Sequence, residues 1–171
     1  MVVTLEDDTA PTASNVGGTL VAPGVIAGVA EVSFAATDTG SGLYSAAVTV
    51  DGVVLGRSLI DGNDARCVPI DGPGSGGAPT PVMRFSWTVP CALAGSGTVS
   101  LDTGVLGDGA HSVVVSVSDA AGNTATVWSG TIHTDNAPQG GIPQIIGDAQ
   151  QGQTLIAGAG TWSPAPTGYT A

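Results

Sequence analysis

Residues Leu106 to Asn123, which read LGDGAHSVVVSVSDAAGN, decide the fold of this chain. The stretch contains an Asp-Gly turn, a run with a period of two residues, and a second turn rich in Asp, Gly and Asn. Val113, Val115 and Val117 fall on one face of the run, while serines occupy the other face. Such alternation is typical of a strand with one buried and one solvent-exposed face, as in an antiparallel sheet.

The chain before Asp135 repeats this pattern of short strands separated by turns. Gly and Pro are frequent, aromatic residues are scarce, and no window combines a helical stripe with an N-cap. The Asp51-Gly52 pair is a strong hairpin signal. The pattern predicts an all-β antiparallel β-sandwich, with an irregular β-barrel as the alternative. The predicted strands cover residues 15–21, 30–38, 43–50, 53–58, 82–89, 97–102, 111–118 and 124–133, with a long loop over 61–81.

An Asp-x-Ala-Pro sequence occurs twice, at Asp8–Pro11 and at Asp135–Pro138. Repeats at such a distance indicate tandem domains with similar linkers. We therefore expect one module over residues 1–137, and a linker with the N-terminal part of a second β module over 138–171. Two short strands, 144–146 and 154–157, cannot bury enough apolar area to stand alone. This tail then packs on the first module, is ragged, or pairs with another chain.

The charge of the chain excludes several classes of partner. Its formal net charge is -11, and its only cations are Arg57, Arg66 and Arg84. Three scattered arginines cannot neutralise a row of phosphates, so we expect no nucleic-acid binding and no binding to an anionic membrane surface. No run of 18 apolar residues exists, so we expect no membrane insertion. The absence of lysine also excludes Lys–Asn isopeptide cross-links.

Two cysteines, Cys67 and Cys91, lie outside any Cys-x-x-Cys motif and far from histidine, so a zinc site has no support. We expect a disulfide that clamps the long loop, and a reactive thiol is the alternative. In the loop-entropy model, closing such a loop with a disulfide raises the free energy of unfolding by roughly 3 kcal/mol. A disulfide implies an oxidising compartment, which predicts a secreted or cell-surface protein.

The order of these motifs resembles bacterial immunoglobulin-like repeats of large secreted and cell-surface proteins. The resemblance implies an immunoglobulin-like sandwich, a stalk, spacer or adhesion role, neighbouring modules of the same kind, and no catalytic residue. It also implies that the second repeat continues for several more strands, so we expect the chain to end within a module. The segments that carry the resemblance are Leu106–His111, Val113–Val115, Asp119–Asn123, Asp38–Leu43, Pro90–Cys91, Gly152–Leu155 and Gly160–Ser163.

No catalytic motif is visible, since the chain has no Gly-x-Ser-x-Gly elbow, no His-Glu-x-x-His and no phosphate-binding Gly-Lys pair. We expect no enzyme. His111 sits where sandwich domains place a corner tyrosine that bonds to nearby backbone, and we expect it to do the same. His133 falls at the end of the last predicted strand.

Acidic residues at turns and module ends suggest one cofactor, calcium, which takes six to eight oxygen ligands. A simpler interpretation makes Asp119 and Asn123 turn formers that bond their own backbone. The candidate ligands are Asp7, Asp8, Asp38, Asp119 and Asp135.

Glycan binding would need exposed aromatic platforms. Trp128 and Tyr44 are the candidate residues, with Trp162 as a third, whereas Trp87 follows the inward parity of its strand. The alternative is that each aromatic residue caps a hydrophobic edge.

These observations predict an extracellular structural or adhesive module: a stalk, a spacer or a fibre subunit. An incomplete second module exposes strand edges, so the 138–171 tail is predicted to pair with another copy and build a head-to-tail homopolymer by strand complementation. The alternative function is a ligand-binding module, for glycan or calcium, appended to a secreted enzyme or adhesin.

Overall fold

The computed structural model describes residues 6–70, 83–137, 139–140, 142 and 144–163. It divides into two compact units, Met1–Asp135 and Asn136–Ala171, and each is described by itself. The regular structure consists of strands with two short 3-10 turns, which confirms the all-β prediction. The unit boundary falls close to the predicted one at residue 137.

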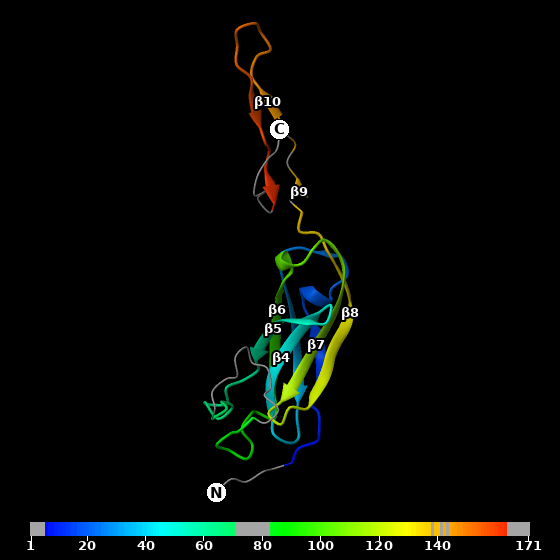
Figure 1. Cartoon of the computed structure of the whole chain (residues 1–171), viewed down its shortest axis with the longest axis vertical. Helices are drawn as coiled ribbons and strands as arrows, with labels where there is room; N and C mark the ends of the chain where they lie inside the picture. The colour runs from blue at the N-terminus through cyan, green and yellow to red at the C-terminus, as the bar shows by residue number, and fades with distance from the viewer. Residues whose placement is uncertain (1–5, 71–82, 138, 141, 143, 164–171) are drawn as a thin grey trace. The chain divides into compact units, whose positions relative to one another are not determined.

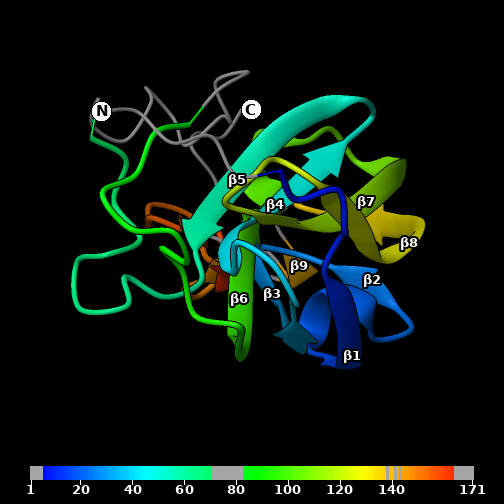
Figure 2. The ribbon, with the colours of Figure 1, turned by 90° about the horizontal axis from the view of Figure 1, so that it is seen from below.

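The first unit consists of two sheets that pack face to face (Figures 1 and 2). Figure 2 shows β4, β5, β7 and β8 on one side, with β1, β3 and β6 on the other. The smaller sheet has the order β1-β3-β6, with β1 Thr12–Gly17, β3 Val29–Thr37 and β6 Ala94–Asp102. The larger sheet has the order β2-β8-β7-β4-β5, with β2 Val25–Ile26, β8 Thr124–Thr134, β7 Gly109–Asp119, β4 Leu43–Val50 and β5 Val53–Leu59.

The core lies between the two sheets and is built by alternate residues of their strands. In β7 the predicted face is buried, since Val113, Val115 and Val117 are each 0% exposed. Burial alternates along β3 as well, where Val32 and Phe34 face inward. Each strand therefore contributes every second side chain to a core shared by both sheets.

Turn chemistry sets the register of the β4–β5 hairpin. Asp51 and Gly52 have φ angles of 50° and 85°. A two-residue turn with both central residues at positive φ matches the right-handed twist of the strands it joins. The hairpin predicted at Asp51-Gly52 is confirmed.

The predicted strand over residues 82–89 is wrong; Val82 itself lies outside the described residues. Residues 83–90 form no strand. Met83 and Phe85 pack instead on a small cluster around Tyr44 and the cysteines, and Trp87 is 54% exposed. The alternating apolar side chains of this segment therefore pack in a loop rather than in a sheet.

The predicted opening strand over 15–21 lies several residues too late. β1 ends at Gly17, and Thr19–Val21 form a 3-10 turn that buries Leu20. The break comes at Gly18, whose φ is 120° and where a Cβ would collide with the carbonyl of Glu31. Only glycine allows the chain to pass so close to β3.

The chain enters and leaves the first unit at opposite ends (Figure 1). β7 and β8 pair antiparallel, with Ser118 opposite Thr124 at one end and Gly109 opposite Thr134 at the other. The entering segment is bonded at the first of these ends, through Asn123. The exit lies at the second end, where Asp135 N–H donates to the Ile26 carbonyl.

The second unit holds two small antiparallel pairs. β10 Gln144–Ile146 pairs with β11 Ile156–Gly158, and β9 Gln139–Gly140 pairs with β12 Trp162–Ser163. The strand predicted at 144–146 is confirmed, and the one predicted at 154–157 begins two residues later.

Candidate metal centre

Three carboxylates meet at the entry end of the first unit. Asp7 precedes β1, Asp38 follows β3, and Asp119 closes β7. One oxygen of each lies within 4.8 Å of one oxygen of each of the others. In the part of the chain that the structure describes, this is the one such group of three or more His, Cys, Asp or Glu side chains.

Asp119 is held by the turn that follows β7. Its Oδ1 accepts the backbone N–H groups of Gly122 and Asn123, at 2.7 and 2.8 Å, and its Oδ2 accepts the Asn123 side-chain amide at 2.8 Å. The side chain is fully buried. Burial, aided by the nearby charge of Asp7, raises the pKa of Asp119 despite these hydrogen bonds. Asp119 is thus the turn former that the sequence predicts.

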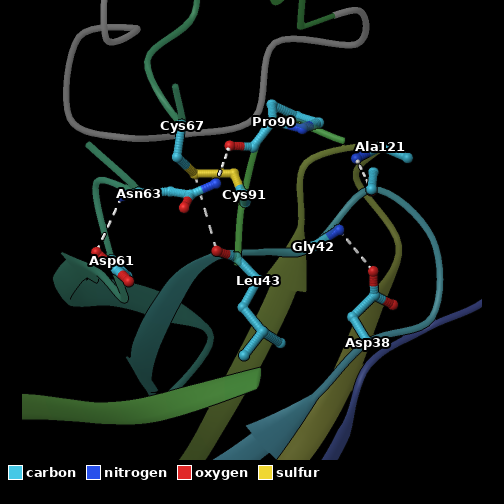
Figure 3. Close-up of a disulfide and its surroundings, with 10 residues drawn as sticks. Asp38, Gly42, Leu43, Asp61, Asn63, Cys67, Pro90, Cys91 and Ala121 are labelled. Carbon is cyan, nitrogen blue, oxygen red and sulfur yellow. Dashed lines mark hydrogen bonds between the residues drawn. A yellow bond between two sulfur atoms is a disulfide. The ribbon is translucent and has the colours of Figure 1, made fainter. Parts of the chain in front are cut away.

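Asp38 is anchored through only one of its oxygens. Its Oδ2 accepts the N–H groups of Gly40 at 3.1 Å and Gly42 at 2.7 Å, the second of which is drawn in Figure 3. Its Oδ1 is buried and has no hydrogen-bond partner. The residue as a whole is 6% exposed.

Asp7 connects the entering segment to the β3–β4 turn. Its Oδ2 accepts Ser41 N–H at 2.7 Å, and its Oδ1 accepts Thr9 N–H at 3.2 Å. A Cβ on Gly40 would collide with this carboxylate, so glycine makes room for it. Desolvation is the largest influence on the pKa of Asp7 and raises it, but the hydrogen bonds from Ser41 and Thr9 together lower it below its usual value.

Asn123 fastens the backbone of the same segment. Its Nδ2 donates to the Asp7 carbonyl at 2.7 Å and lies 3.5 Å from the Thr9 carbonyl. Gly40 and Gly42 are not predicted from the sequence as parts of a site, whereas Asn123 is predicted there as a turn former with Asp119. The signal for the two glycines in the sequence is their spacing in Asp-Thr-Gly-Ser-Gly, residues 38–42. By itself this spacing predicts only a turn.

No protein cation among the described residues neutralises this group. The ion pair in that part of the chain joins His111 to Asp51, and no arginine pairs with Asp7, Asp38 or Asp119 there. Clustered carboxylates with few protein cations nearby are a donor set that suits hard divalent ions such as calcium.

Two other predicted ligands lie elsewhere. Asp8 is exposed and outside the three-carboxylate group. Asp135 lies at the exit end, partly buried, with its N–H bonded to Ile26. Of the five candidate ligands, Asp8 and Asp135 therefore do not belong to the three-carboxylate group, and Asp135 lies at the other end of the β7–β8 hairpin.

Cys67 and Cys91 form the predicted disulfide (Figure 3). Their Cα atoms are 4.6 Å apart, and the residues are 0% and 1% exposed. They pack with Tyr44 and Ala120, and the Asn63 Nδ2 donates to the Pro90 carbonyl beside them at 2.9 Å. The bond joins Cys67, after β5, to Cys91, before β6, and the Cys67 Sγ lies 3.8 Å from the Leu43 carbonyl at the start of β4.

In the described part of the chain, none of the three aromatic residues predicted for glycan binding, Tyr44, Trp128 and Trp162, is fully exposed. Tyr44 is 1% exposed and packs edge-on against Phe85, with ring centroids 6.1 Å apart, so its prediction as a sugar-stacking residue is wrong. Trp128 is half-buried against the core, at a bulge where β8 shifts register, and its ring covers Gly130. Trp162 donates its Nε1–H to the Ala159 carbonyl at 2.7 Å. The exposed indole is Trp87, with the Arg66 guanidinium 4.4 Å from its ring centroid.

His111 bonds to backbone, as predicted. Its Nε2 lies 2.8 Å from the Gly107 carbonyl, four residues upstream. Its Nδ1 lies 2.7 Å from an oxygen of Asp51, a partner that the sequence pattern does not suggest.

No family model and no curated protein sequence matches this chain. No helix in the described part is long and apolar enough to cross a membrane. The function is therefore argued from the residues and the geometry above.

Proposed function

We propose that the chain is an extracellular structural module, an immunoglobulin-like spacer for linear arrays on a cell surface or in a secreted protein. The observation that carries the proposal is the placement of entry and exit. The entering segment is bonded to the turn after β7, and the exit follows β8 at the other end of the same hairpin. A module joined at opposite ends extends an array by its own length.

The length gained per module follows from strand geometry. β7 and β8 each have 11 residues. At about 3.4 Å per residue, such a hairpin spans roughly 37 Å. Two sheets with a shared core resist extension along this direction, since unfolding the module requires both sheets to separate.

The disulfide supports an extracellular location and limits extension under load. Buried cystines are typical of oxidising compartments. The Cys67–Cys91 bond closes a segment with a sequence separation of 24, which cannot be pulled out while the bond is intact.

Two measurements test the spacer proposal. Spin labels at Thr9→Cys and His133→Cys, two exposed positions at the two ends, should report a separation of roughly 35 Å. Pulling on the full chain by its termini should give one main unfolding event, and reduction of the disulfide should lengthen its extension by about 85 Å. A short label separation, or extension at low force without a distinct event, would contradict the proposal.

A second candidate function is self-assembly through the tail. In the second unit, β10 and β11 pair only with each other among the described residues, and aliphatic side chains on them, and at Ile142 before β10, stay exposed. The exposed fractions are 82% for Ile142, 74% for Ile145, 60% for Ile146 and 66% for Ile156. Exposed strand edges with apolar faces recruit strands from other chains.

In this second proposal, another copy of the chain covers the exposed isoleucines and strand edges of the second unit. Light scattering should show oligomers whose size grows with concentration, and Ile145→Lys should abolish them. Val54→Lys serves as the matched control, because Val54 is 50% exposed on β5 of the first unit. A monomer at all concentrations would rule out assembly and leave the spacer proposal standing.

A further inference from the structure

We propose that Asp7, Asp38 and Asp119 bind one calcium ion, which fastens the entering segment to the first unit. The proposal concerns a ligand, and it does not depend on the spacer role. Its first support is the convergence of three carboxylates from three distant segments within 4.8 Å. Like charges at this distance repel one another, so a protein holds them together only against a cost.

The second support is the unpartnered oxygen of Asp38. The residue is 6% exposed, and its Oδ1 is buried without a hydrogen-bond partner. Buried acceptors in native proteins are nearly always satisfied, and an exception calls for a specific explanation such as an ion. The Oδ2 of the same carboxylate is occupied by Gly40 and Gly42 N–H groups, which orient the free oxygen.

The three carboxylates are positioned in advance. Asp119 is fixed by Gly122 and Asn123, and Asp7 by Ser41. Most of these anchors are backbone N–H groups, and the Asn123 side-chain amide also donates to Asp119 Oδ2. A carboxylate offers about four acceptor sites, so each of the three keeps at least one lone pair for a metal. Binding an ion therefore requires little ordering of side chains, and preorganisation of this kind favours affinity.

The donor set suits calcium better than magnesium. Calcium takes six to eight oxygen ligands at 2.3–2.6 Å in a flexible geometry, whereas magnesium demands a near-ideal octahedron at 2.0–2.1 Å and usually keeps several waters. Three carboxylates supply three to six oxygens, depending on how many bind through both, and water completes the shell. Oxygen-only ligands exclude the ions that prefer thiolate.

The ion would join the entering segment to the sandwich. Asp7 belongs to that segment, whereas Asp38 and Asp119 end strands of the two different sheets, β3 and β7. One calcium ion would therefore tie both sheets and the entering chain at a single point. Without it, the segment retains the hydrogen bonds of Asp7 and Asn123.

Calorimetric titration of the full chain, after chelation and dialysis, tests the site. We expect one calcium ion per chain with Kd of roughly 10⁻⁴–10⁻³ M, the range of extracellular modules. Calcium should raise the Tm, and equimolar magnesium should raise it less. Amide exchange of Thr9 and Ser41, both bonded to Asp7, should slow when calcium is added.

Single Asp→Asn substitutions test whether the calcium ion binds at these three carboxylates. Asp38→Asn should weaken binding roughly tenfold or more, because affinity falls with the charge of the ligand set. Asp8→Asn is the matched control, since it removes the same charge from an exposed neighbour of Asp7 outside the group. Should Asp38→Asn fail to fold, Asp7→Asn replaces it, because Asp7 lies outside the strands.

Two outcomes would overturn the proposal. One is absence of calcium uptake by the unmodified chain at millimolar calcium. The other is equal calcium affinity in the unmodified chain and in folded Asp38→Asn or Asp7→Asn, which would place the ion elsewhere. Neither outcome affects the spacer proposal, whose measurements concern end-to-end distance and extension.

Discussion

His111 Nδ1 lies 2.7 Å from Asp51 Oδ2, so the start of β7 is joined to the β4–β5 turn by an ion pair. The other ring nitrogen faces the Gly107 carbonyl at 2.8 Å. Both partners are acceptors, and only the imidazolium donates from both nitrogens. The geometry therefore favours the charged histidine.

This ion pair makes stability depend on pH. The hydrogen bonds that His111 donates to Asp51 and to the Gly107 carbonyl raise the pKa of His111 above 6.5, and the bond donated by His111 lowers the pKa of Asp51 below 3.8. The histidine's stabilisation is complete below its unfolded pKa and is lost as pH rises through the raised pKa. The stabilisation that Asp51 contributes is present above its unfolded pKa, and it is lost as pH falls through its lowered pKa in the folded protein. The pair thus stabilises the fold most between pH 3.8 and 6.5.

His111→Gln should remove the part of this dependence that lies above pH 6. We expect the difference in Tm between the unmodified chain and His111→Gln to shrink from pH 6 to pH 8. His133→Gln is the control, because His133 is exposed and forms no ion pair with the described residues. A constant difference across that range would contradict the assignment of a charged His111.

Loss of the disulfide should lower the free energy of unfolding by about 3 kcal/mol in the chain-entropy model. The paired substitution Cys67→Ala with Cys91→Ala keeps the site apolar and avoids two buried thiols. Urea titration of this variant and of the unmodified chain, with and without reductant, measures the difference. If reductant shifts the variant as much as the unmodified chain, the effect does not come from this bond.

Gly97→Ala should destabilise the fold by about 1–3 kcal/mol through overpacking. A Cβ at Gly97 would lie 2.5 Å from the ring of Phe34, which is 3% exposed and enclosed by the core. Gly95→Ala, two residues earlier on β6, is the matched control.

At Gly95 the nearest heavy atom to a Cβ is 3.5 Å away, an ordinary contact. The control should therefore be neutral or stabilise by up to about 1 kcal/mol, since alanine restricts the unfolded chain. Thermal unfolding of the two variants gives the comparison. Equal losses in both would mean that the strand, and not Phe34, disfavours the methyl group.

Asn123→Ala should loosen the entering segment. The substitution removes the amide that donates to the Asp7 carbonyl and to Asp119, and we expect a loss of about 1–3 kcal/mol. Amide exchange at Thr9 should become faster. Asn63→Ala, which removes a bond to the Pro90 carbonyl instead, should leave exchange at Thr9 unchanged.

Local chemistry explains why some elements could be predicted. The alternation of β7 and the Asp51-Gly52 turn depend on neighbouring residues alone, and both lie where the pattern places them. The residues after position 82 show equally clear alternation but form no strand. Periodicity reports which side chains are apolar, whereas a strand also needs a free edge with which to pair.

The candidate metal centre was predictable only in part for a similar reason. Turn positions identify Asp38 and Asp119 as acids with ordered carboxylates, and Asp7 as an acid near a module end. Nothing in the chain order separates Asp7 from Asp8, or shows that Asp135 is at the far end. Those distinctions arise when β3 and β7 bring their ends together across the two sheets.

The sequence by itself therefore determined the all-β class, the hairpin turn and the cysteine pair, because period-two burial and positive-φ turn residues act over a few positions. Only the tertiary structure decided that Tyr44 is buried beside the disulfide and that Trp87 is exposed. It also decided that Asp38 keeps an unpartnered oxygen beside two other carboxylates. Burial and charge clustering depend on contacts between distant segments, which only packing of the two sheets creates.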